Sequence, residues 1–221
     1  MFEKRFLPFL SLLIFSQFFL GIPKAESGLL GDYTTSYKPI KVEQRRTAGG
    51  GSRKCQNNLP ENSVSLLVPE AEVVHQTSSA TPSLFLHSKV ASNLPFKFTL
   101  VNPQVAAPLV EQTFSISQPG IKQIKLPKST RLEPGTIYLW NVAIPCQQGP
   151  LEYEVLRAAI ERVPVSTKVT KQLQQTDTNE ETAAVYASNG IWYEALDFAV
   201  SARDRPEYLE RLLANVGLVF E

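Results

Sequence analysis

The sequence predicts a mainly β protein, an antiparallel β-sandwich followed by a short helical segment. Short runs of alternating apolar and polar residues recur between residues 63 and 163, and Pro, Gly, Asn or Ser separates them. After Val163 the periodicity becomes helical. A period of two, without intervening helical patterns, favours an antiparallel sandwich or barrel over a parallel sheet. With 43% hydrophobic residues, the 221-residue chain can bury a core without a cofactor.

The clearest alternation lies between residues 96 and 101, where Phe96, Phe98 and Leu100 share one face and Lys97 and Thr99 share the other. This pattern is typical of a strand with one buried and one solvated side. We expect about seven such strands within a sandwich domain of residues 55–164. Their expected ranges are 64–68, 84–87, 96–101, 113–117, 121–126, 137–144 and 155–163.

A central strand is expected in the stretch LEPGTIYLWNVAIPC, which runs from Leu132 to Cys146. Its first residues form the pattern L-x-P-x-T-x-Y, in which Pro134 makes a turn and Tyr138 follows four residues later. The pattern resembles the turn before the sixth strand of fibronectin type III and related immunoglobulin-like domains, where a tyrosine hydroxyl binds the backbone just upstream. This resemblance makes Pro134 and Tyr138 structural residues of an immunoglobulin-like sandwich.

Helix signals follow in residues 165–221. Ser166 can cap a weakly helical stretch, Thr178 and Glu181 form a capping box, and Asn189-Gly190 is typical of a helix end. The pattern Y-x-x-x-G-x-W-Y-E-A-L-x-x-A-x-x-A is similar to a single tetratricopeptide repeat. One repeat cannot bury a continuous face, so we expect a helical hairpin packed on the sandwich, with Trp140 and Trp192 both mostly buried.

The N-terminus has the features of a secretory signal. Lys4 and Arg5 precede the apolar stretch FLPFLSLLIFSQFFLGI, and a signal peptide of residues 1–25 is expected, with an uncleaved anchor as the alternative. Residues 26–54 are rich in Gly, Ser, Thr and charges, and predict a flexible linker. The expected location is the periplasm or outside the cell. A formal net charge of +1 argues against a nucleic-acid partner.

The chain has two cysteines, Cys55 and Cys146. In an exported chain an isolated pair favours a disulfide, and closing a loop of about 90 residues would stabilise the fold by roughly 4 to 5 kcal/mol. Two buried free thiols or half of a metal site are the alternatives. The two histidines, His75 in an expected loop and His87 at the end of a strand, have no recognised ligand spacing to either cysteine, so no metal or cofactor is predicted.

No linear motif indicates an enzyme. A serine hydrolase needs a base beside its nucleophile, and the chain contains no G-x-S-x-G elbow near His75 or His87. We expect a non-enzymatic extracytoplasmic interaction or scaffold module that binds another protein or a peptide. One alternative is a small-ligand or glycan-binding protein with Tyr153, Phe85 or Trp192 as an aromatic platform. Another is an enzyme whose site no linear motif reveals.

Three stretches together, GGGSRKC, LEPGTIYLWNVAIPC and GIWYEALDFAV…LLANVGL, resemble the family called domain of unknown function 928. The resemblance runs from about Gly49 to Leu218, and the helix start WYEAL is its most specific part. It implies a cyanobacterial, usually exported protein. Because the family has no assigned activity, it implies no catalytic residues.

Overall fold

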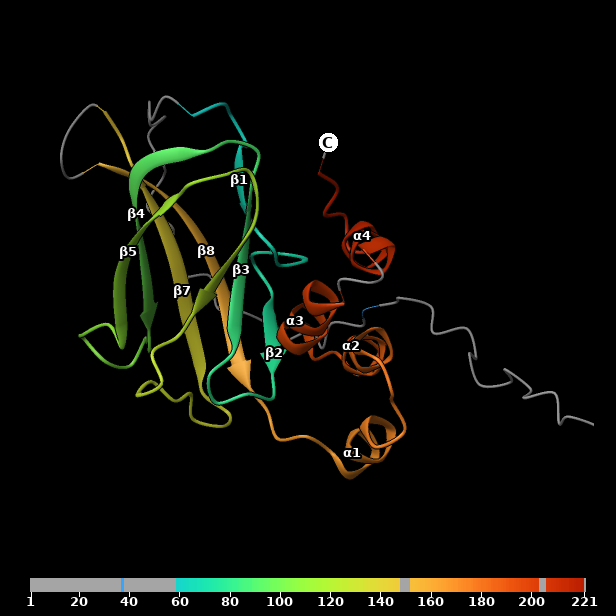
Figure 1. Cartoon of the computed structure of the whole chain (residues 1–221). Helices are drawn as coiled ribbons and strands as arrows, with labels where there is room; N and C mark the ends of the chain where they lie inside the picture. Colours follow the sequence, from blue (N-terminus) through green and yellow to red (C-terminus); the bar gives the residue numbers. More distant parts are fainter. Residues whose placement is uncertain (1–36, 38–58, 148–151, 203–205, 221) are drawn as a thin grey trace, which may run out of the picture. The chain divides into compact units, whose positions relative to one another are not determined.

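The computed structural model describes Tyr37 and residues 59–147, 152–202 and 206–220, which lie in one compact unit, Tyr33–Glu221. Within the described residues eight strands form two sheets, and four helices follow them (Figure 1). The chain is therefore mainly β with a C-terminal α segment, as predicted. None of the described helices is long and apolar enough to cross a membrane. The predicted leader, residues 1–25, lies outside the described residues.

The smaller sheet has three antiparallel strands in the order β1-β3-β6. Its central strand, SLFLHS, buries Leu84, Phe85 and Leu86, and an aromatic residue such as Phe85 packs well on a pleated surface. The strands are β1 (Val64–Leu66), β3 (Ser83–Ser88) and β6 (Gly120–Lys125).

The larger sheet has five strands in the order β2-β8-β7-β4-β5. Strand β7 lies at its centre, as the sequence predicts. It alternates strictly between half-buried and buried residues. The strands are β2 (Val74–Thr77), β8 (Tyr153–Arg162), β7 (Ile137–Pro145), β4 (Ser92–Val101) and β5 (Val110–Ile116).

Strand β2 corrects the sequence prediction, which placed His75 in a loop. Its residues VHQT are all buried, so they show no alternation that could indicate a strand. The strand pairs with β8 in parallel, and His75 lies opposite Ile160. All other strand pairs in the two sheets are antiparallel. The larger sheet therefore has one parallel strand pair, at the edge formed by β2. The buried polar side chains of β2 need hydrogen-bond partners within the protein.

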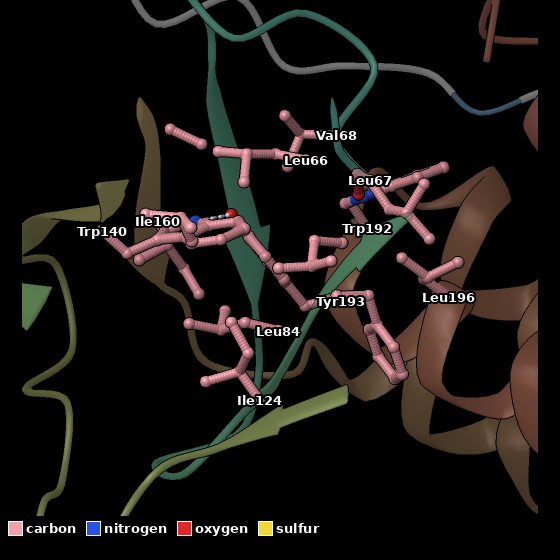
Figure 2. Packing of buried hydrophobic residues seen from close by; sticks show 14 of the residues in the cluster. Leu66, Leu67, Val68, Leu84, Ile124, Trp140, Ile160, Trp192, Tyr193 and Leu196 are labelled. Atoms are coloured by element: carbon pink, nitrogen blue, oxygen red, sulfur yellow. Dashed lines mark hydrogen bonds between the residues drawn. The ribbon is translucent and has the colours of Figure 1, made fainter. Parts of the chain in front are cut away.

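Both sheets contribute to one hydrophobic core, which makes the arrangement sandwich-like. Leu84 and Ile124 come from the smaller sheet, and Trp140 and Ile160 come from the larger one (Figure 2). Trp192, the first residue of helix α3 (Trp192–Ser201), belongs to the same core. Trp140 and Trp192 are each 0% exposed, which confirms the prediction that both rings are buried.

The helices are α1 (Thr167–Leu173), α2 (Asn179–Ser188), α3 (Trp192–Ser201) and α4 (Pro206–Ala214). The predicted caps are confirmed: Ser166 accepts from the N–H of Val169, and Thr178 forms a capping box with Glu181. Gly190 lies between α2 and α3 and has a φ of +76°. Glycine suits this position because it adopts the left-handed backbone conformation at a helix end without steric cost. Helix α3 lies against β2 and β3 (Figure 1).

Candidate functional site

The first turn of α3 is attached to the sheets by three consecutive side chains, Trp192, Tyr193 and Glu194. Their exposed fractions are 0%, 1% and 9%. The residue before the helix, Ile191, offers no side-chain cap. The polar atoms of the three side chains bind groups of the two sheets and of their loops, and these contacts define the candidate site.

Two aromatic residues of this turn bind across the core. The Trp192 Nε1–H donates to the carbonyl oxygen of Leu67 at 2.8 Å, just after β1. The Tyr193 hydroxyl accepts from Trp140 Nε1 of β7 at 2.8 Å (Figure 2). The same hydroxyl donates to the carbonyl oxygen of Ala159 on β8 at 3.4 Å. Burial raises the pKa of the Tyr193 hydroxyl, so the phenol stays protonated. Helix α3 is thereby fixed to both sheets.

Glu194 binds the turn that follows β2. Its Oε1 accepts from the Thr77 hydroxyl at 2.6 Å and from the N–H of Ser79 at 2.9 Å, and its Oε2 accepts from the N–H of Ser78 at 3.0 Å. Burial raises the pKa of the Glu194 carboxyl, and these three donors act against that shift. Both carboxylate oxygens are therefore engaged by the chain itself.

His75 is held from both sides of its ring. Its Nε2 lies 2.8 Å from the carbonyl oxygen of Glu70 and 3.4 Å from the N–H of the same residue. The shorter contact decides the tautomer, because a carbonyl can only accept: Nε2 carries the hydrogen. Nδ1 is then an acceptor, and the Tyr37 hydroxyl donates to it at 2.9 Å. Burial lowers the pKa of His75, which keeps the ring neutral.

These contacts join distant parts of the chain. A general acid or base must reach a proton of its substrate within hydrogen-bond distance. The ring nitrogens of His75 and the carboxylate of Glu194 instead face the chain's own groups, at 2.6 to 3.0 Å. In the described part of the chain, no three His, Cys, Asp or Glu side chains are placed to hold a metal ion. The arrangement fastens α3 and Tyr37 onto the sheets.

The three aromatic residues expected to form a ligand platform are not together on the surface. Phe85 is 1% exposed in β3, and Trp192 is 0% exposed. A platform that includes these two rings is wrong, because a buried ring has no free face on which a ligand can stack. Tyr153, at the start of β8, is 40% exposed.

The predicted structural residues lie where the sequence places a turn and a strand. The backbone of Pro134 forms an isolated parallel β-bridge with Arg162. The Tyr138 hydroxyl accepts from the N–H of Glu133 at 2.9 Å. Cys146 follows β7, and no cysteine in the described residues carries a free thiol. Cys55 lies outside the described residues, so its disulfide with Cys146 stays a prediction.

One face of the larger sheet carries an exposed patch on neighbouring strands, which we call the β7–β8 face. Tyr153 and Val155 are 40% and 45% exposed and lie opposite Pro145 and Ala143 of β7. The next row is polar: Arg157 donates to Asn141 Oδ1 at 2.8 Å, and Asn141 donates to Thr99 on β4 at 3.1 Å. Side chains two residues apart on a strand share a face, so the apolar pair and the polar row are adjacent.

A family model described as Domain of Unknown Function (DUF928) matches residues 48–219. The chain belongs to the Domain of Unknown Function 928 family. The matched residues contain both sheets, all four helices and the first turn of α3. Tyr37 precedes them.

Other comparisons add little. A search of curated proteins finds none that matches the chain. The chain is similar to a solved structure described as an engineered protein, with 6% identity and a TM-score of 0.29, over 45% of this chain and 20% of that chain.

In this Domain of Unknown Function 928 chain, the sequence analysis did not predict the contact of Glu194 with Thr77, which fastens α3. It also did not predict the contact between Tyr37 and His75. A weak signal for Glu194 is present, because it is the only charged residue in the apolar stretch GIWYEAL. Tyr37 lies within residues 26–54, where a flexible linker is expected. At Tyr37 that expectation is wrong, because its side chain is 9% exposed and hydrogen-bonded. The other residues of that segment lie outside the described residues.

Proposed function

We propose that this chain is an exported, non-enzymatic interaction or scaffold module that binds another protein through the β7–β8 face. The observation that carries the proposal is the exposure of Tyr153 and Val155 beside the ordered row of Arg157, Asn141 and Thr99. Protein interfaces combine a few buried anchor residues, often Tyr and Arg, with a polar rim. This face presents both on a rigid sheet.

The buried contacts of α3 support the scaffold part of the proposal. Trp192, Tyr193 and Glu194 belong to the stretch that best characterises the family resemblance, and their polar atoms bind the chain's own groups. Their role is to hold a helical layer on the sheets. A rigid framework of this kind suits a module that presents a surface, because pre-organised residues lose less entropy on binding.

A crosslinking experiment tests the proposal. A photo-crosslinking amino acid is placed at Tyr153 of the full chain in its native cell, and the matched control carries it at Val105, which is 53% exposed in the loop after β4. We expect a discrete protein adduct from position 153 and none from position 105. Tyr153→Ala with Val155→Ser should abolish capture by a crosslinker at Ala143. Equal adducts at 153 and 105, or none at 153, would contradict the proposal.

The finer features of the fold are also proposals. The hydrogen bond from Glu133 N–H to the Tyr138 hydroxyl supports an immunoglobulin-like corner, and Gly190 between α2 and α3 supports a tetratricopeptide-like hairpin. The cyanobacterial source and the export by residues 1–25 stay predictions. The small-ligand alternative retains only Tyr153 of its three expected rings, and no observation favours the enzyme alternative.

A further inference from the structure

The walls of one buried site are fixed independently of its occupant. His75 on β2 and Trp192 on α3 face the ring of Tyr37. His75 Nε2 donates to Glu70, and Trp192 Nε1 donates to Leu67, so both rings are oriented by backbone carbonyls of the segment between β1 and β2. We call these two rings and the two carbonyls the His75–Trp192 socket.

The ring of Tyr37 fits this socket by both shape and polarity. Its edge contacts Trp192 with ring centroids 4.9 Å apart and an interplanar angle of 64°, an arrangement that aromatic pairs prefer. Its centroid lies 5.8 Å from that of His75, and its hydroxyl donates to His75 Nδ1 at 2.9 Å. The socket therefore offers an aromatic wall and one acceptor, which are the features that recognise a phenol.

The occupant comes from outside the part of the chain that the family shares. The family match begins at residue 48, whereas Tyr37 lies before it, and all four socket residues lie within it. The family domain thus supplies the site, and the preceding segment supplies the ring.

We infer that the His75–Trp192 socket is a tyrosine-recognition site, which this chain fills with its own Tyr37. The side chain of Tyr37 thereby attaches this position of the chain to the domain. A phenol without a peptide backbone should bind the same socket once Tyr37 is removed, because both walls keep their own hydrogen bonds to Glu70 and Leu67.

The test uses p-cresol, the tyrosine side chain without its backbone, and the full chain with Tyr37→Ala. p-Cresol should raise the folding equilibrium constant of this variant by the factor 1 + [p-cresol]/Kd, measured by urea denaturation and calorimetric titration. Toluene lacks the hydroxyl and leaves the buried Nδ1 of His75 unpaired, so it should bind about tenfold more weakly. The matched control is Tyr153→Ala, which removes an exposed tyrosine and should create no p-cresol site.

Three results would overturn the inference: no p-cresol effect on Tyr37→Ala, an equal effect on Tyr153→Ala, or equal binding of toluene and p-cresol. A dimeric wild-type chain that becomes monomeric on Tyr37→Ala would show that the ring comes from a second copy. If Tyr37→Ala does not fold, Tyr37→Phe keeps the ring and should lower the folding equilibrium constant roughly tenfold. Unchanged stability of Tyr37→Phe would also refute recognition of the hydroxyl.

Discussion

Replacing Glu194 with Gln tests whether its carboxylate closes the turn after β2. Glu194 presents two acceptor oxygens to three donors, whereas Gln presents one oxygen and one NH₂ group. Either orientation of the amide places the NH₂ opposite a backbone N–H, of Ser78 or of Ser79. A buried donor without an acceptor costs about 1–3 kcal/mol, so Glu194→Gln should lower the free energy of unfolding by about 2 kcal/mol.

The expected loss is large enough to measure by two methods. For a domain of this size, about 2 kcal/mol corresponds to a fall in Tm of roughly 4–8 °C. Urea denaturation followed by circular dichroism at neutral pH gives the free energy directly. The matched control is Glu210→Gln on the exposed side of α4, which should change stability by less than about 0.5 kcal/mol. If Glu194→Gln is as stable as Glu210→Gln, the turn does not depend on the carboxylate.

Three further predictions follow from single contacts. Burial lowers the folded-state pKa of His75, so the unfolded chain takes up a proton first as the pH falls below about 6.5. The free energy of unfolding is therefore retained above that pH and falls below it. His75→Asn should reduce this dependence of the free energy on pH, measured by urea denaturation from pH 7.5 to 5, more than His87→Asn does. Tyr138→Phe removes the acceptor of Glu133 N–H and should cost about 1 kcal/mol, measured by the same denaturation at neutral pH. Thr178→Ala removes the cap of α2 and should also cost about 1 kcal/mol, with faster amide hydrogen exchange in the first turn of α2.

Each of these predictions has a result that contradicts it. A slope that is the same in His75→Asn and the wild type would assign the pH dependence to other groups. Wild-type stability in Tyr138→Phe would mean that water replaces the hydroxyl at Glu133. Unchanged hydrogen exchange in Thr178→Ala would mean that packing, not the cap, holds the start of α2.

The sequence predicts those parts of the fold that depend on local patterning. Phe96, Phe98 and Leu100 alternate with polar residues because one face of β4 is buried, and the capping box of Thr178 and Glu181 is readable because its partners are three residues apart. Each of these signals is contained within a few residues.

The parts that sequence analysis misses depend on partners far away in the chain. Strand β2 is completely buried and short, so neither periodicity nor length distinguishes it from a loop. The hydroxyl of Thr77 and the carboxylate of Glu194 are 117 residues apart, and Tyr37 and His75 are 38 residues apart. No spacing rule connects such pairs, so only the tertiary structure shows that these polar side chains are satisfied internally.

The parallel pair of β2 and β8 has a consequence for biosynthesis. Strand β2 leaves the ribosome early, but its neighbour β8 and the helix residue Glu194 are translated much later. Contacts of such high sequence separation form slowly, because loop closure must come before they stabilise the chain. The nascent polypeptide therefore carries β2 without its partner strand through most of its synthesis. We expect it to rely on chaperones until its last helices are made.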